Sequence, residues 1–119
     1  MNEFTFYDQS GYPIAYCDDG HHIYLFSGKP VAYILEDSVF SFEGHHLGWL
    51  HNGWVRDHNG DAVFFTENAS GGILKPIPNP RPFKAFKEFL PFKGFRNFPP
   101  LKPLWSLEWG EHDNFFFSS

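Results

Sequence analysis

Histidine is the residue type in this sequence that most invites a chemical interpretation. Seven histidines occur among 119 residues, and two adjacent pairs, His21-His22 and His45-His46, each follow a glycine. Neighbouring residues on a strand point to opposite faces, so such a pair seldom supplies two ligands to one ion. The spacings that zinc sites use, His-x-x-x-His and Cys-x-x-Cys, do not occur in the sequence. We therefore expect no metal site and no cofactor, and we interpret the paired histidines as exposed turn residues.

Charged side chains beside aromatic ones form a second candidate, the run Arg56-Asp57-His58 with Trp49 and Trp54 nearby. On a regular strand Arg56 and His58 would share one face and Asp57 would lie on the other. One interpretation is structural: Arg56 pairs with a carboxylate or lies over an aromatic ring. The other is a small-ligand or glycan site formed by these five residues, because aromatic faces stack on sugars. Both interpretations stay open at the level of the sequence.

Cys17 is the only cysteine and the one thiol nucleophile to consider. Its neighbours Asp18 and Asp19 would raise the thiol pKa and blunt its reactivity. No Gly-x-Ser-x-Gly, P-loop or dinucleotide fingerprint occurs, so we expect a protein that is not an enzyme. A lone cysteine excludes an intrachain disulfide, and the sequence begins without the basic and apolar regions of a secretory signal. With no apolar run of about 18 residues, we expect a cytoplasmic protein without a membrane segment.

The charges are unevenly divided along the chain, although the net charge is only −5. Residues 1–72 carry ten acidic and two basic side chains, whereas residues 73–104 carry seven basic and one acidic. A basic segment tied to an acidic domain is attracted first to that domain, or to a neighbouring copy of it. Nucleic acid would have to compete with that partner. We therefore do not expect nucleic-acid binding, even though basic and aromatic residues interleave in the segment.

Four glycines spaced 17, 16 and 16 residues apart mark an internal repeat in the first half: Gly11, Gly28, Gly44 and Gly60. Three positions are apolar in every unit, at five residues before the glycine, three after it and five after it. These apolar columns are Phe6, Ile23, Val39, Val55; then Ile14, Val31, Leu47, Val63; then Tyr16, Tyr33, Trp49, Phe65. Four residues before the glycine, units one to three have an aromatic side chain and unit four has Arg56.

Each unit is typical of a β-hairpin, because two runs of aromatic and β-branched residues flank a glycine turn. Eight short strands are predicted, near residues 3–8, 13–17, 22–27, 31–35, 38–43, 46–50, 54–58 and 62–66. One unit of about 16 residues cannot bury its own apolar face, whereas four can if they close into a ring or barrel around the three apolar columns. The sequence therefore predicts an all-β fold of four hairpins.

Two stretches of these hairpins carry a family resemblance. The runs Gly11-Tyr-Pro-Ile-Ala-Tyr16 and His46-Leu-Gly-Trp-Leu-His-Asn-Gly-Trp-Val-Arg-Asp-His-Asn-Gly60 resemble those of bacterial proteins described as four-fold β-flower proteins. The resemblance covers about residues 4–70. It implies four hairpins arranged like petals about a pseudo-four-fold axis, and it implies no particular activity.

Beyond Gly71-Gly72 the composition changes to a proline-, phenylalanine- and lysine-rich segment with a period of three. Every third residue from Phe83 to Leu104 is apolar, and Lys or Arg follows most of them. This period fits neither an α-helix nor a strand but matches polyproline II, which has three residues per turn. A straight segment of this kind would span about 75 Å. It must therefore bend round the β-domain, cross to a partner or extend freely.

The predicted function is that of an interaction or assembly module. An exposed phenylalanine stripe of this size marks an interaction surface. We expect a homo-oligomer, most simply a dimer, whose arm lays six phenylalanines into a groove of the same or a neighbouring subunit: Phe83, Phe86, Phe89, Phe92, Phe95 and Phe98. An external protein partner is the other way to cover the stripe. We divide the chain into a four-hairpin domain (1–70), an extended arm (71–106) and a C-terminal tail (107–119).

Overall fold

The computed structural model describes residues 3–110 and 116–117, and the regular elements within them are eight β-strands. They are β1 (Phe4–Tyr7), β2 (Pro13–Cys17), β3 (His22–Leu25), β4 (Pro30–Leu35), β5 (Ser38–Phe40), β6 (His46–His51), β7 (Trp54–Arg56) and β8 (Ala62–Phe65). Each overlaps one of the eight predicted strands, so the predicted all-β fold is confirmed. Among the described residues, no helix is long and apolar enough to cross a membrane.

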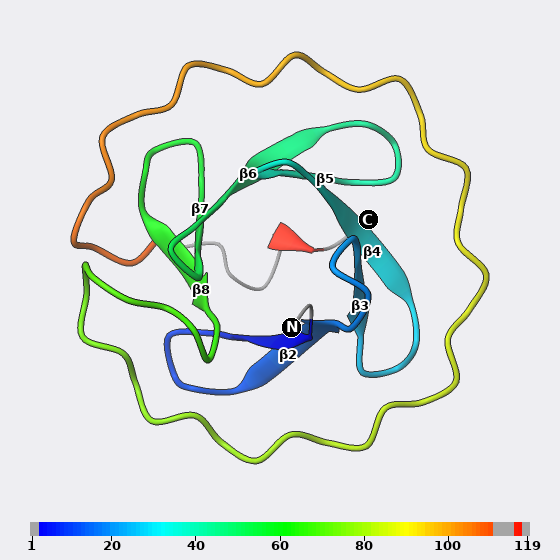
Figure 1. Ribbon diagram of the computed structural model, residues 1–119, viewed down its shortest axis with the longest axis horizontal. Coiled ribbons are helices and arrows are strands. Elements are labelled where there is room, and N and C mark those ends of the chain that lie inside the picture. The colour runs from blue at the N-terminus through cyan, green and yellow to red at the C-terminus, as the bar shows by residue number, and fades with distance from the viewer. Residues whose placement is uncertain (1–2, 111–115, 118–119) are drawn as a thin grey trace.

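The eight strands form a closed antiparallel barrel. Each strand pairs with the next one along the chain, and β1 pairs with β8 through Tyr7 and Phe65. Figure 1 shows the four hairpins set around a common central axis. Closure of this kind removes the unpaired edges that an open sheet would expose. The predicted arrangement of four hairpins about a pseudo-four-fold axis is therefore confirmed.

The four glycine turns are built alike. In each, the glycine N–H donates to the carbonyl three residues earlier at 2.9–3.0 Å. The φ angles of Gly11, Gly28, Gly44 and Gly60 lie between 83° and 103°. Glycine adopts this left-handed region without the steric cost that a Cβ brings. The spacing of the glycines in the sequence is therefore the spacing of one repeated turn geometry.

Two of the three apolar columns form the central core, and the third does not. Phe6, Ile23, Val39 and Val55 are each 0% exposed and pack with the column that follows the glycine by three residues. The prediction that the barrel closes around all three columns is wrong for Tyr16, Tyr33, Trp49 and Phe65. Residues three and five after the glycine would share one face of a regular strand. The register of every hairpin shifts at the second column, however, where Ile14, Val31, Leu47 or Val63 is the extra residue of a β-bulge. The bulge lets this residue join the core together with its neighbour, for example Ala15 or Ala32, so the side chain that follows faces outward. The third column is buried on the outer face, beneath the arm.

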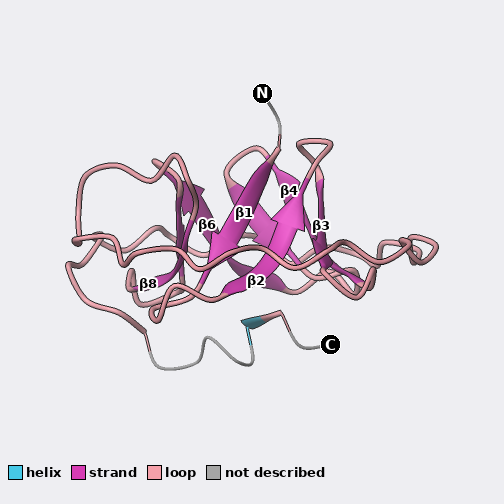
Figure 2. Cartoon of the chain, turned by 90° about the horizontal axis from the view of Figure 1, so that it is seen from below, coloured by secondary structure: helices cyan, strands magenta, loops and turns pink. Residues whose placement is uncertain are grey.

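The end of the chain returns to the barrel axis. The Phe116 and Phe117 rings lie 5.7 and 5.0 Å from the ring of Phe64, and Phe117 is 5.9 Å from Phe6. Both are at most 7% exposed. These two side chains complete the core at the end of the barrel that Figure 2 shows at the bottom.

The arm forms a ring around the barrel. Residues 73–104 contain no helix or strand, and Figure 1 shows them encircling all four hairpins. Figure 2 shows that the ring crosses the barrel between its two ends. Of the three courses open to an extended segment of this length, the chain bends round its own β-domain. The left-handed polyproline II geometry of the arm and the three-part division of the chain stay predictions.

Candidate functional site

The arm contacts the barrel every nine residues. The N–H groups of Asn79, Glu88, Asn97 and Ser106 donate to the carbonyls of the four turn glycines at 2.8–3.0 Å. At the same turns, a Cβ on the glycine would overlap an arm carbonyl, that of Ile77, Phe86, Phe95 or Leu104. Each glycine is thus required twice, by its own turn and by the close approach of the arm.

This nine-residue repeat was missed at the level of the sequence. The period of three drew attention to the phenylalanines, while the signal for the longer period lay in Lys75, Lys84, Lys93 and Lys102. Three triplets of arm therefore match one hairpin of barrel. The match gives the arm the same pseudo-four-fold symmetry as the barrel that it encircles.

The cations of the arm point inward onto the third apolar column and its neighbours. Lys84 lies 4.4 Å from the Tyr16 ring centre, Lys87 lies 4.6 Å from Tyr24, and Lys93 lies 4.5 Å from Tyr33. Cation–π contacts are worth about 0.5–1 kcal/mol when exposed and about 2 or more when desolvated. Burial raises the pKa of Tyr16 and of Tyr24, and the nearby Lys87 offsets this only in part.

Ion pairs also join the arm to the acidic barrel. Lys84 lies 2.7 Å from a Glu3 carboxylate oxygen, Lys87 lies 2.8 Å from Asp18, and Lys102 pairs with Asp37. These groups are partly exposed, and ion pairs of this kind contribute only about 0–1 kcal/mol each. The backbone hydrogen bonds at the four glycine turns, at about 0.5–1.5 kcal/mol each, therefore hold the arm at least as firmly as the ion pairs do.

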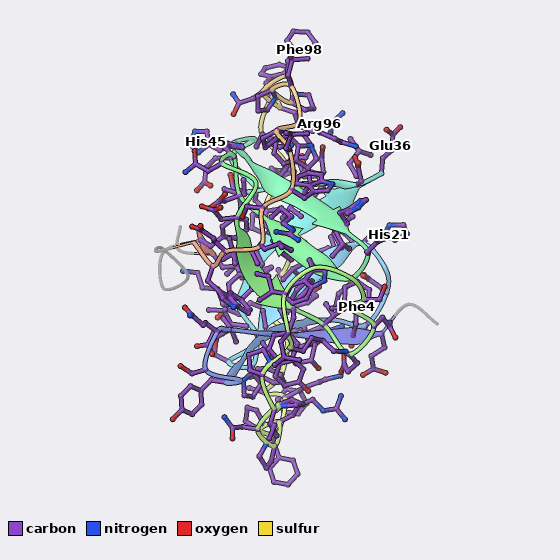
Figure 3. All side chains as sticks on the ribbon, turned by 90° about the vertical axis from the view of Figure 1, so that its left-hand side faces the viewer. Phe4, His21, Glu36, His45, Arg96 and Phe98 are labelled. Carbon is purple, nitrogen blue, oxygen red and sulfur yellow. The ribbon has the colours of Figure 1, made fainter. Side chains whose placement is uncertain are left out.

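The six predicted interface phenylalanines all point away from the barrel. Phe83, Phe86, Phe89, Phe92, Phe95 and Phe98 are 95–100% exposed. Figure 3 shows Phe98 at the outer edge, with Arg96 closer to the strands. The prediction that they fill a groove of the same subunit is wrong, because the period of three turns them outward whenever the lysines face inward. A groove on a neighbouring subunit stays a prediction. We call these six residues, with Leu101 and Leu104, the apolar belt.

Unit four reverses the roles of cation and aromatic ring. The arm position that holds Lys87 and Arg96 in units two and three holds Trp105 in unit four, and the barrel position beneath it holds Arg56. The Arg56 guanidinium lies 6.0 Å from the Trp105 ring centre and 5.7 Å from that of Trp54. Arg56 Nη1 also donates to the carbonyls of Gly60 at 3.0 Å and Ser106 at 2.6 Å. Arg56 therefore ties the end of the arm to the last hairpin.

The other predicted site residues are divided by the structure. Trp49 and His58 lie together, with ring centres 5.7 Å apart, and Trp49 is 5.7 Å from Trp105. Asp57 lies apart from them in the turn, where its Oδ1 accepts from the N–H groups of Asn59 and Asp61 at 2.9 and 3.0 Å. Asp8 caps the turn of unit one in the same way. The role of the five residues in binding a ligand stays a prediction.

His46 differs from the exposed turn residue that was predicted. It is 6% exposed, and its Nδ1 lies 2.9 Å from His58 Nε2 while its Nε2 lies 3.1 Å from Ser38 Oγ. Burial first, and the neighbouring His58 second, lower the pKa of His46 to about 4. The prediction failed because β6 begins at His46, whose ring packs against Phe40 and Trp49 on the outer face of the barrel, where the arm covers it.

The Cys17 thiol is 0% exposed. Burial is the main cause that raises its pKa to about 11, and Asp19 and Asp18 add to the effect. The direction of this shift agrees with the one predicted from the sequence, with burial rather than charge as its chief cause. Across residues 3–110 and 116–117, no group of three or more His, Cys, Asp or Glu side chains is arranged to hold a metal ion.

A comparison with known protein families finds one whose model matches this chain. The model of a family described as "4-fold beta flower protein" matches residues 4–117. The chain belongs to this four-fold β-flower family. The match extends beyond residues 4–70, over which the resemblance was drawn, and includes the arm that encircles the barrel. The family description names an architecture and no activity. Searches of curated proteins and of solved structures found no match.

Proposed function

We propose that this β-flower protein is an assembly module, a cytoplasmic bacterial homo-oligomer whose subunits associate through the apolar belt. One observation carries the proposal: six phenylalanines that are 95–100% exposed stand on an arm fixed to the barrel at every hairpin. A soluble protein seldom exposes so large an apolar surface unless it is covered by a partner. Because the arm is held by its backbone and its cations, the belt is presented in a preordered form, which lowers the entropic cost of association.

The area of the belt fits a dimer. A phenylalanine side chain buries about 150–250 Å², so the three of one nine-residue unit offer roughly 600 Å². A stable interface needs about 800 Å² from each partner. Two adjacent units, for instance the stretch from Phe83 to Phe98, therefore supply enough area. The near-equivalent units also allow further copies to bind elsewhere on the ring.

The direction of the arm's cations favours a protein partner over nucleic acid. Lys84, Lys87, Lys93 and Arg96 all lie against barrel aromatics, and two of the lysines are also paired with carboxylates. A strand of nucleic acid would meet phenylalanines without the cationic track that its phosphates require. The alternative of a small-ligand or glycan module is favoured by a different observation, the hollow beside Arg56 at the end of the arm.

A variant in which all six belt phenylalanines are replaced by serine tests the proposal. Because these side chains are almost fully exposed, the variant should keep the circular dichroism spectrum of the natural protein. Each buried phenylalanine is worth about 1.5–3 kcal/mol. Loss of even two from an interface should therefore weaken dimerisation at least about 100-fold by sedimentation equilibrium. Tyr12→Ser, at a side chain that is 60% exposed and lies outside the belt, is the control and should leave dimerisation unchanged. Equal dimerisation of both variants would refute the proposal.

A further inference from the structure

Arg56 is a buried cation with neutral partners. It is only 3% exposed, and among the described residues no carboxylate forms an ion pair with it within 4.0 Å. Its Nη1 hydrogen bonds end on the carbonyls of Gly60 and Ser106. Burial lowers the pKa of Arg56, and the more distant Asp61 and Asp57 offset this only in part. A buried charge is costly when no opposite charge accompanies it.

One edge of the guanidinium is left for another partner. Arg56 Nε is buried and has no hydrogen-bond acceptor within the described part of the chain. Nη2 faces Gly72, since a Cβ on that glycine would lie 3.2 Å from it. The indoles of Trp54 and Trp105 lie against the guanidinium at 5.7 and 6.0 Å. They restrict a ligand to the open side.

That open side is a hollow of about 140 Å³. It lies at the seam of the ring, where the arm begins at residues 70–72 and returns at residues 105–107. A water molecule occupies about 30 Å³ of the liquid, so the hollow has room for a few non-hydrogen atoms. In the other three units the barrel position of Arg56 holds an aromatic residue, Tyr7, Tyr24 or Phe40. The seam is therefore unlike the rest of the ring.

We propose that the seam hollow binds a small carboxylate, whose oxygen accepts from Arg56 Nη2 and supplies the opposite charge that no residue in the described part of the chain pairs with the guanidinium. Arginine is the side chain best suited to carboxylates, because its donors lie in one plane. The ligand would seat beside Gly72, where the absence of a side chain leaves space. The proposal does not depend on self-association through the apolar belt.

Nuclear magnetic resonance of the full-length protein, titrated with sodium acetate at constant ionic strength, tests the proposal. The Arg56 Nε–H and Trp54 indole N–H resonances should shift and saturate with a dissociation constant on the order of millimolar, as befits so small a ligand. Sodium chloride alone should cause no saturable shift. Saturable shifts confined to other residues, or none up to high acetate, would overturn the proposal. Saturation by sodium phosphate but not by acetate would overturn the assignment to a carboxylate.

Two neighbouring glycines provide a matched pair of variants. Gly72→Ala should weaken acetate binding at least about tenfold, because its methyl group would lie 3.2 Å from Nη2. Gly71→Ala should leave binding unchanged, because a Cβ there meets nothing within 4 Å. The φ angles of 79° and 70° make the backbone strain similar in the two variants. Equal acetate affinity in both would place the site elsewhere. The resonance shifts of the unmodified protein decide the matter if Gly72→Ala does not fold.

Discussion

Arg56 and Trp105 form a cation–aromatic pair in which the barrel supplies the cation and the arm supplies the ring. This pair leads to a prediction about what fixes the register of the arm on the barrel. Arg56→Tyr and Trp105→Lys, made together, would give unit four the same pair that Tyr24 and Lys87 form in unit two. Each single variant should be destabilised, and the double variant should be more stable than the sum of the two changes implies. Residues in direct contact commonly couple by 0.5–3 kcal/mol.

The size of the effect follows from the contacts. Arg56→Tyr removes two hydrogen bonds from a charged donor, which together contribute about 3–6 kcal/mol, and the cation–π contacts with Trp54 and Trp105, so it should cost at least about 3 kcal/mol. Trp105→Lys loses the contact with Trp49 and brings a second cation to Arg56, so it should cost about 2–4 kcal/mol. The new tyrosine–lysine contact should return about 1–2 kcal/mol in the double variant.

Urea unfolding followed by far-ultraviolet circular dichroism measures the four free energies of the cycle. The control is Arg56→Tyr combined with Lys84→Trp, two positions that do not touch, which should be additive within about 0.5 kcal/mol. If the cycle of Arg56 and Trp105 is equally additive, then cation–aromatic pairing does not hold the end of the arm and the reasoning is refuted.

Three further outcomes are expected. Gly28→Ala should release the arm to limited proteolysis, because its Cβ would overlap the Phe86 carbonyl, whereas Gly71→Ala should not. The free energy of unfolding should fall as the pH drops from about 6.5 to about 4, because the buried His46, whose pKa is lowered to about 4, binds its proton more readily when unfolded. His46→Gln should flatten this part of the pH profile. The free energy of unfolding that the natural protein loses over this range, and the variant does not, should be up to about 3 kcal/mol. Cys17, whose pKa is raised by burial to about 11, should resist iodoacetamide at pH 8 in the native protein and react only after unfolding.

The hairpin architecture could be predicted because a glycine marks the turn of each unit in the sequence. A glycine at positive φ is needed at every turn, and the apolar residues on either side follow it at fixed distances. The closure of the ring could also be anticipated, because no single unit buries its apolar face. The placement of Tyr16, Tyr33, Trp49 and Phe65 could not, since an aromatic column looks the same in a sequence whether a core or an arm covers it.

The arm was harder to predict, because its meaning depends on what it touches. The period of three showed that phenylalanines and lysines lie on different sides, but it could not say which side faces the barrel. The aromatic rings of Tyr16, Tyr24 and Tyr33 decide this by attracting the lysines. The pairing of Arg56 with Trp105 was beyond reach for the same reason. It joins residues 49 positions apart through a match between two different repeat lengths, so neither repeat alone reveals it.

Self-association through the apolar belt is the central functional claim, and the solution mass of the intact chain tests it most directly. Light scattering across about 5–200 μM protein should give a mass that reaches at least twice the 13.8 kDa of one chain, as expected for burial of about 800 Å² per partner. A mass that stays at one chain over the whole range would contradict the claim and would leave the belt to be covered by a different protein.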